Sequence, residues 1–314
     1  ATGKHAASAE AARVRDYIVP VLERHGVQLV LNGHEHTYQR TYELRGGTPV
    51  EANTGGIVHV TSGGGGAQPS YFDPDTRVAK SLGVNHFLYS EVSGPALQIK
   101  AHGIDGTEID ALTLQPKPQI GSAVNSASFT SDVAAGSAVT IFGRNLFPEP
   151  ASGGVLEAYG CSVRVNGEAV PLQFADAMQV NIALPASVSG DVTLEVRTPN
   201  GSASTTLHLK AVAPALFGNP SEPGTALATV GGELITSETP VSAGATIALY
   251  ATGLGSGDAV HVRIGGAEAV SVVAQRVFAG VWEVTAKVPA ASGNLAVQLS
   301  VNGVLSNELR LPVA

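Results

Sequence analysis

The sequence is poor in the residues that build disulfide frameworks and charged surfaces. It has one cysteine, Cys161, in 314 residues, which excludes an intrachain disulfide framework and a zinc site built from cysteines. Only 5% of the residues are aromatic and 14% charged, whereas 37 are glycine. This composition favours turn-rich β structure over helical bundles or disorder.

Basic charge and long apolar runs are also scarce. The net charge of −8 excludes a nucleic-acid partner, because no basic stripe is present to neutralise phosphates. No apolar run reaches the roughly 20 residues of a membrane-spanning helix. The chain opens "ATGKHAASAEAARVR", without an initiator methionine or a signal peptide. We therefore expect residue 1 to be an interior position of a longer protein.

The N-terminal part of the chain predicts a helix followed by a strand. Apolar residues recur at helical spacing between residues 9 and 24, with Ser8 as N-cap, Gly26 as the stop and Pro20 as a kink or early end. The apolar run Val27–Leu31 is typical of a buried parallel strand. Ligands bind outside the carboxyl ends of such strands, so a site is expected just after Leu31.

The rest of the chain predicts β structure in three parts. A β meander continues to "QPKPQ" (Gln115–Gln119), whose two prolines mark a domain boundary. Beyond it, "AGSAVTIFGRNL" (135–146) returns as "AGATIALYATGL" (243–254), and "QVNIALP" (179–185) returns as "EVTAKVP" (283–289). We predict a first domain over 1–115 and two β-sandwich modules over 116–214 and 215–314. The two copies resemble the immunoglobulin-like modules of the IPT/TIG type found in secreted bacterial proteins.

The main candidate for chemistry is "VLNGHEHTYQRT" (Val30–Thr41), in which His34 and His36 stand one residue apart. Neutral imidazoles are good ligands for Zn, Fe and Mn, and the alternative is a pair of surface histidines in a turn. The H-E-x-x-H pattern of zincins would need histidine at Tyr38. The H-x-H-x-D-H pattern of metallo-β-lactamases would need an acidic residue there.

The motif resembles the last signature block of calcineurin-like metallophosphoesterases, in their purple acid phosphatase branch, with the pattern G-H-x-H-x-Y-x-R. Gly33, His34, His36, Tyr38 and Arg40 match it. The resemblance covers about residues 1–114 and implies a partial metallophosphoesterase β-sandwich with a flanking helix. The expected fold class is therefore α+β plus two all-β immunoglobulin-like sandwiches.

The resemblance also implies a chemistry for the longer protein. His34 would ligate one metal ion and His36 a second (Fe, Zn or Mn), and a metal-bound hydroxide would attack a phosphate ester. The D-x-H, G-D-x-x-Y and G-N-H-[ED] blocks of the family are missing from this chain. The chain as given is therefore expected to bind metal weakly or not at all and to be inactive. The resemblance further implies secretion or a place at the cell surface.

Other residues have two open roles. Gly64 and Gly65 in "TSGGGG" belong either to a phosphate cradle or to a flexible loop at the mouth of the site. His5 is either a rim residue or a solvated loop residue, and His86 closes a strand or lies at the site. The remaining expectations are structural: packing for His59, turn acids at Asp73 and Asp75, a helix end at His25 and a buried strand position for Cys161.

Two functions follow from this reading. The first is the C-terminal part of a secreted dinuclear-metal phosphatase. The alternative is a non-catalytic extracellular binding or adhesion protein, whose tandem immunoglobulin-like modules contact a surface, a glycan or a partner protein.

Overall fold

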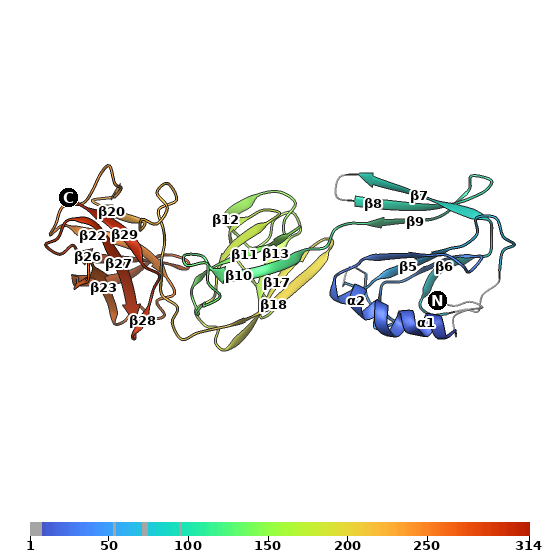
Figure 1. Ribbon diagram of the computed structural model, residues 1–314, viewed down its shortest axis with the longest axis horizontal. Helices are drawn as coiled ribbons and strands as arrows, with labels where there is room; N and C mark the ends of the chain where they lie inside the picture. Colours follow the sequence, from blue (N-terminus) through green and yellow to red (C-terminus); the bar gives the residue numbers. More distant parts are fainter. Residues whose placement is uncertain (1–7, 53–54, 71–74, 94–95) are drawn as a thin grey trace. The chain divides into compact units, whose positions relative to one another are not determined.

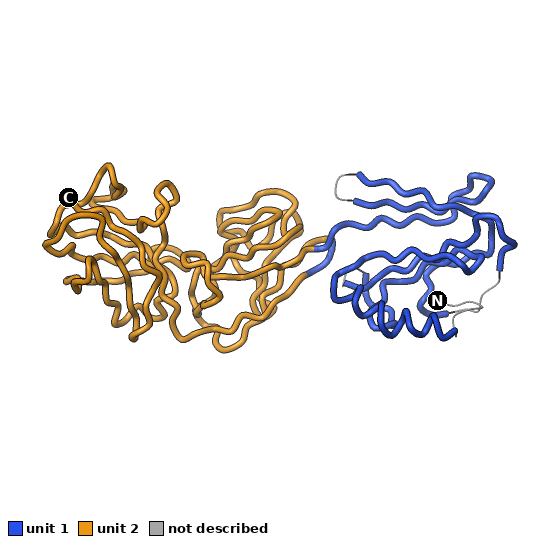
Figure 2. Tube along the Cα trace, in the orientation of Figure 1, with its two compact units in different colours: residues 1–117, 200–202 blue, residues 118–199, 203–314 orange. Residues whose placement is uncertain are grey.

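The computed structural model describes residues 8–52, 55–70, 75–93 and 96–314 (Figure 1). Two compact units divide the chain: unit 1 comprises residues 1–117 and 200–202, and unit 2 comprises residues 118–199 and 203–314 (Figure 2). No described helix is long and apolar enough to cross a membrane.

Unit 1 begins with the predicted helix, in three short pieces. Ser8 caps it by accepting a hydrogen bond from the Ala11 N–H at 3.1 Å. A π-helical turn lies just before Pro20, whose missing N–H interrupts the α-helical hydrogen-bond pattern. The pieces are α1 (Ala9–Arg13), the π-helical turn (Val14–Ile18) and α2 (Val19–Arg24).

The strands of unit 1 form two main sheets and a small hairpin. The first sheet has the order β1-β5-β2-β6, and only β1 and β5 run parallel. The second has the antiparallel order β7-β8-β9. The strands are β1 (Leu29–Asn32), β2 (Tyr38–Thr41), β3 (Leu44–Arg45), β4 (Thr48–Pro49), β5 (Val58–Ser62), β6 (Val78–Leu82), β7 (His86–Ser93), β8 (Ala96–Gly103) and β9 (Glu108–Leu114).

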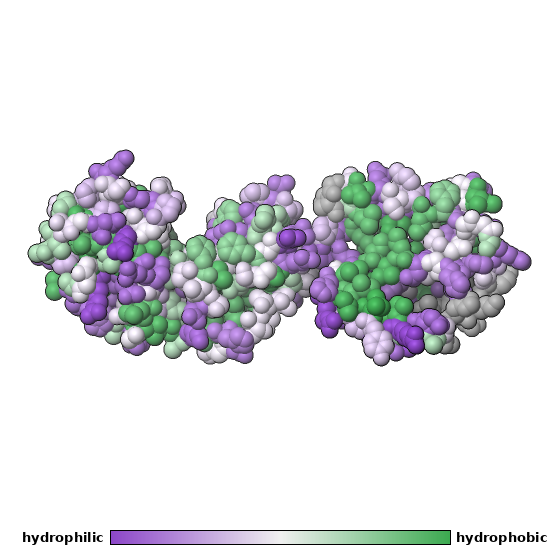
Figure 3. Space-filling view, viewed as in Figure 1, coloured by the Kyte–Doolittle hydropathy of each residue, from purple (hydrophilic) through white to green (hydrophobic). Residues whose placement is uncertain are grey.

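The prediction for Val27–Leu31 is confirmed in its pairing and wrong in its burial. β1 is parallel to β5, but it lies at the edge of its sheet, and Leu31 is 54% exposed. Val14 and Tyr17 of the helical segment are exposed as well, and the space-filling view shows an apolar area on unit 1 (Figure 3). The buried cluster of this unit is correspondingly small: Tyr38, Val58, Val60 and Ala101.

Unit 2 contains two β-sandwiches. The first sandwich (residues 119–208) pairs a sheet of order β10-β11-β16-β15-β12 with one of order β14-β13-β17-β18. Its strands are β10 (Gln119–Asn125), β11 (Ala138–Arg144), β12 (Ala151–Val155), β13 (Ser162–Val165), β14 (Glu168–Val170), β15 (Leu172–Ala175), β16 (Gln179–Ala183), β17 (Asp191–Thr198) and β18 (Gly201–His208).

The second sandwich (residues 215–313) repeats this arrangement with a sheet of order β21-β20-β22-β26-β25, to which β19 adds, and a sheet of order β24-β23-β27-β28, to which β29 adds. Its strands are β19 (Ala215–Leu216), β20 (Ala228–Val230), β21 (Glu233–Leu234), β22 (Thr246–Thr252), β23 (Val260–Ile264), β24 (Ala267–Glu268), β25 (Val270–Phe278), β26 (Val281–Lys287), β27 (Gly293–Val301), β28 (Val304–Leu305) and β29 (Leu309–Val313).

The register of the sheets reproduces the internal repeat of the sequence. Phe142 of β11 lies opposite Gln179 of β16, and Tyr250 of β22 lies opposite Glu283 of β26. These pairs are related by the offsets of the repeat, 108 and 104 residues. Each sandwich has its own core, with Ile141 and Cys161 fully buried in the first.

Buried hydrogen bonds join the two sandwiches within unit 2. The Thr252 hydroxyl in the second sandwich accepts from the Ala138 N–H of the first at 2.8 Å, and it donates to the Gly280 carbonyl of its own sandwich at 2.6 Å. The Asn125 side chain donates to the Ala213 carbonyl at 3.1 Å. Because these groups are buried, each bond removes a cost of burying an unpaired polar group.

The expected α+β class is wrong. Strand and bridge residues make up 53% of the described residues and helical residues 5%, and the described helical part is one short segment that contains no buried residue. A segment of this length contributes little to a core, so the described fold is all-β, with immunoglobulin-like sandwiches.

Candidate functional site

The two histidines of the sequence motif lie in the loop Gly33–Thr37, between β1 and β2, at the carboxyl end of β1. His34 is exposed and has a φ of +75°, whereas His36 is half-buried. A positive φ is uncommon outside glycine, so this loop turns sharply at His34.

The glycine-rich loop packs directly against this turn. A Cβ on Gly63 would lie 2.1 Å from the Glu35 carbonyl oxygen, and one on Gly64 would lie 2.3 Å from His86 Nδ1. Nothing lies within 4 Å of a Cβ on Gly65. Close packing thus accounts for Gly63 and Gly64, and the loop brings the two predicted motifs together.

His86 closes the cluster from the start of β7, and it is 3% exposed. Its Nε2 lies 3.0 Å from Ser62 Oγ and its Nδ1 lies 2.8 Å from the Val84 carbonyl oxygen. Its ring meets that of Tyr38 edge-on at 5.5 Å. Both ring nitrogens have partners in the fold. This favours the structural role of His86, closing a strand, over a place at the site.

The last two residues of the motif, Tyr38 and Arg40, hold the two sheets of unit 1 together. The Tyr38 hydroxyl donates to Asp110 Oδ2 at 2.8 Å. Arg40 donates to both carboxylate oxygens of Asp110, at 2.7 and 3.1 Å. A two-point contact of this kind is among the stronger ion-pair geometries, and it connects β2 to β9.

The pKa values of this network reflect the same contacts. Burial raises the pKa of the Tyr38 hydroxyl well above its usual value, and the hydrogen bond to Asp110 adds to the effect. Burial also raises the pKa of Asp110, but the hydrogen bonds from Arg40 and Tyr38 lower it by more, so it lies below its usual range. The carboxylate is therefore ionised at neutral pH and committed to Arg40 and Tyr38.

The remaining sequence candidates have structural roles or lie outside the described part of the chain. Burial lowers the pKa of His59, and Cys161 is fully buried, as expected for packing residues. Asp75 is a turn residue that accepts from the Arg77 N–H at 2.8 Å, and His25 ends α2. His5 and Asp73 lie outside the described residues.

Within the described residues, no group of three or more His, Cys, Asp or Glu side chains could hold a metal ion. Ligation by His34 and His36 stays a prediction. The contacts within this loop cluster are packing contacts. Gly64 leaves room for the buried ring of His86, and Asp110 holds the strand that follows the loop through its hydrogen bonds with Tyr38 and Arg40.

A second candidate, which the sequence motifs did not reveal, is the outer face of the five-stranded sheet in the first sandwich. Val139, Ile141, Val180 and Ile182 point into the core and are fully buried. Alternation along a strand therefore places their neighbours on the opposite side of the sheet. We call this surface the phenylalanine face and define it by Phe129, Phe142, Phe174, Gln179 and Asn181.

Pairing across the strands sets the arrangement of this face. Phe142 lies opposite Gln179, and Asn181 lies opposite Phe174. The Gln179 amide donates to Asn181 Oδ1 at 3.0 Å. The face thus alternates aromatic rings with amides, and these four side chains are half-buried.

Phe129 reaches this face from a turn with φ of +57° and is 63% exposed. Its ring lies 6.3 Å from that of Phe142, tilted by 32°. Asn125, which is 1% exposed, supports the turn: its Oδ1 accepts from the Ala127 and Ser128 N–H groups. The sequence signal was present in the repeat, where the first copy has Phe142 and Gln179 and the second has Tyr250 and Glu283.

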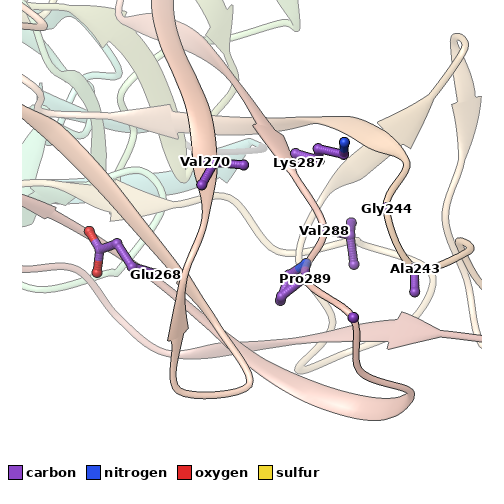
Figure 4. A pocket seen from close by; sticks show the side chains of 8 residues that line it. Ala243, Gly244, Glu268, Val270, Lys287, Val288 and Pro289 are labelled. Atoms are coloured by element: carbon purple, nitrogen blue, oxygen red, sulfur yellow. The ribbon is translucent and has the colours of Figure 1, made fainter.

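The second sandwich has a shallow open pocket of about 400 Å³, lined by Glu268, Val270, Lys287 and Pro289 among others (Figure 4). Glu268 already contacts His261 at 3.0 Å and Arg263 at 3.3 Å. The pocket therefore offers few polar groups to a ligand.

Comparisons with known proteins give distant likenesses. No family model matches the chain, and no curated protein matches it. Among solved structures, SGBP-B of Bacteroides ovatus, in complex with a mixed-linkage heptasaccharide, is 14% identical and covers 70% of this chain and 52% of its own, with a TM-score of 0.31. SGBP-B of Bacteroides uniformis is 15% identical over 63% of this chain and 50% of its own, at 0.24. The titin tandem A164–A165 is 13% identical over 62% and 95%, at 0.21.

The chain thus spans about half the length of the first two of these proteins. TM-scores this low carry no argument about function, so the assignment rests on the chain's own geometry.

The expected metallophosphoesterase resemblance is wrong, and so is the hydrolase activity drawn from it. The described chain is nearly all β, and no family model matches it. Tyr38 and Arg40, which match the signature block, are engaged by Asp110 in contacts that hold the fold.

Proposed function

We propose that this chain is a non-catalytic binding protein that acts outside the cell or at its surface through its two immunoglobulin-like sandwiches. The observation that carries the proposal is the phenylalanine face. Unit 2 has two buried apolar cores, and on the outer side of one sheet Phe129, which is 63% exposed, lies beside the half-buried Phe142. Exposed aromatic residues on a rigid scaffold are typical of binding surfaces.

The fold supports this role because a sandwich of antiparallel sheets presents rigid outer faces. The hydrogen bonds of Thr252 and Asn125 tie the two sandwiches together, so a ligand on one face meets a preorganised surface. Preorganisation lowers the entropy lost on binding. The partner class is a surface polymer or glycan.

The test uses the full chain. We expect immobilised protein to retain members of a glycan array or isolated cell-envelope polymers, and a heat-unfolded sample to retain none of them. We also expect no turnover of p-nitrophenyl phosphate in the presence of Zn²⁺, Mn²⁺ or Fe³⁺. Failure to retain any polymer, or turnover above the uncatalysed rate, would overturn the proposal.

A further inference from the structure

We propose that the phenylalanine face binds a neutral glycan and that the equivalent face of the second sandwich does not. This inference rests on the proposed binding function and adds the site, its residues and the class of ligand. The juxtaposition that carries it is aromatic rings and amides on one partly exposed sheet face, with no ionisable side chain among the five defining residues.

The rings supply the apolar half of such a site. A sugar ring has apolar C–H faces and a polar rim of hydroxyl groups. Phe142 and Phe174 are half-buried, so their rings are held by neighbours while part of each remains open to solvent. Phe129 adds an exposed ring 6.3 Å from Phe142. Flat aromatic surfaces of this kind stack against C–H faces and bury apolar area at low entropic cost.

The amides supply the polar half. Each amide has two donor hydrogens and one carbonyl acceptor. The bond from Gln179 to Asn181 uses one donor and one acceptor site, and it holds the two side chains beside each other along β16. The remaining donor and acceptor capacity can bind hydroxyl groups, which both donate and accept. Ser152, opposite Phe174 at the edge of the sheet, is exposed and adds a further hydroxyl.

The charge of the face selects a neutral ligand. The whole chain has a net charge of −8, and this charge repels polyanions at long range. None of the five defining residues carries a charge that could pair with a basic or acidic partner. A neutral, hydroxyl-rich ligand loses no ionic hydration when it lies on this surface, so it is the class that the surface complements.

The second sandwich provides an internal comparison. At the repeat-related positions it has Tyr250 in place of Phe142 and Glu283 in place of Gln179. The Gln275 side chain donates to Glu283 at 2.9 Å. A carboxylate accepts hydrogen bonds only and is strongly hydrated, so this face is less suited to a neutral polyol.

The experiment measures binding of the full chain to mixed-linkage β-glucan, xyloglucan and soluble starch by affinity electrophoresis and calorimetry, with polygalacturonate as the anionic comparison. Phe142→Leu keeps apolar bulk but removes the ring, and Gln179→Glu introduces the residue of the second sandwich. We expect each to weaken binding at least tenfold. Tyr250→Ala, the matched control, should change it less than twofold.

The outcomes separate the site from the general function. If the wild type binds and neither Phe142→Leu nor Gln179→Glu changes that binding, the assigned site is wrong, while the binding function stands. Binding to polygalacturonate alone would overturn the neutral class. A wild type that binds none of these polysaccharides, but retains another envelope polymer, would overturn the inference and preserve the proposed function. Hydrogen exchange of peptides from β11 and β16, read by mass spectrometry, verifies that the first sandwich of each variant has folded.

Discussion

The carboxylate of Asp110 should be the strongest single contributor to the stability of unit 1. In Asp110→Asn the shape is kept, but Arg40 loses its counter-charge and part of its two-point hydrogen bond. The side chains of Arg40 and Asp110 are 21% and 11% exposed. Removing one partner of a fully buried pair costs about 3–5 kcal/mol. Because Arg40 retains some access to water, we expect a loss of about 2–3 kcal/mol in the free energy of unfolding.

The size of this effect can be checked against a pair on the same sheet. Lys100 and Glu108 lie 3.4 Å apart, with side chains 34% and 48% exposed. Exposed pairs contribute about 0–1 kcal/mol, so Glu108→Gln should have little effect. For a unit of this size, about 2–3 kcal/mol corresponds to a fall of roughly 10 °C in melting temperature.

The assay must distinguish the two units. The single tryptophan, Trp282, lies in the second sandwich, so its fluorescence reports on unit 2 and serves as an internal reference. Hydrogen exchange of peptides from β2 and β9, read by mass spectrometry, reports on unit 1. Protection that is equal in Asp110→Asn and Glu108→Gln would refute the reasoning, because it would mean that Asp110 does not hold the sheets together.

Three further predictions follow from buried contacts. Gly64→Ala should destabilise unit 1 by about 1–3 kcal/mol, since its Cβ would lie 2.3 Å from His86 Nδ1, whereas Gly65→Ala should be nearly neutral; equal effects in hydrogen exchange would contradict this. Thr252→Val should lower the melting temperature of unit 2, measured by tryptophan fluorescence, because it leaves a buried N–H and a buried carbonyl unpaired at a cost of about 1–3 kcal/mol each; an unchanged melting temperature would count against the bridge. The contribution of the Asp110 carboxylate to the stability of unit 1 is present in full above the ordinary carboxyl pKa of about 3.9, and it is lost as the pH falls through the lowered pKa of the folded state. Hydrogen exchange in unit 1 should therefore rise below about pH 4. An equal rise in Asp110→Asn would argue against the assignment.

The sequence by itself determined the local structure and the repeat. The N-cap at Ser8 and the interruption near Pro20 depend on residues close in sequence. The apolar run after the helix predicted a parallel strand, although its partner, β5, lies far along the chain. The copies of the sandwich motif fall at the predicted offsets because the alternation of core residues fixes the register of β11 and β22.

Only the tertiary structure decided the roles of the residues in the sequence motifs. The roles of Tyr38 and Arg40 depend on Asp110, about 70 residues away, and no local spacing reveals such a contact. The loop needs glycine at position 64 because the ring of His86 packs directly against it. The phenylalanine face likewise requires strands β11, β15 and β16 to lie side by side, since rings and amides distant in sequence form one surface only when the sheet has assembled.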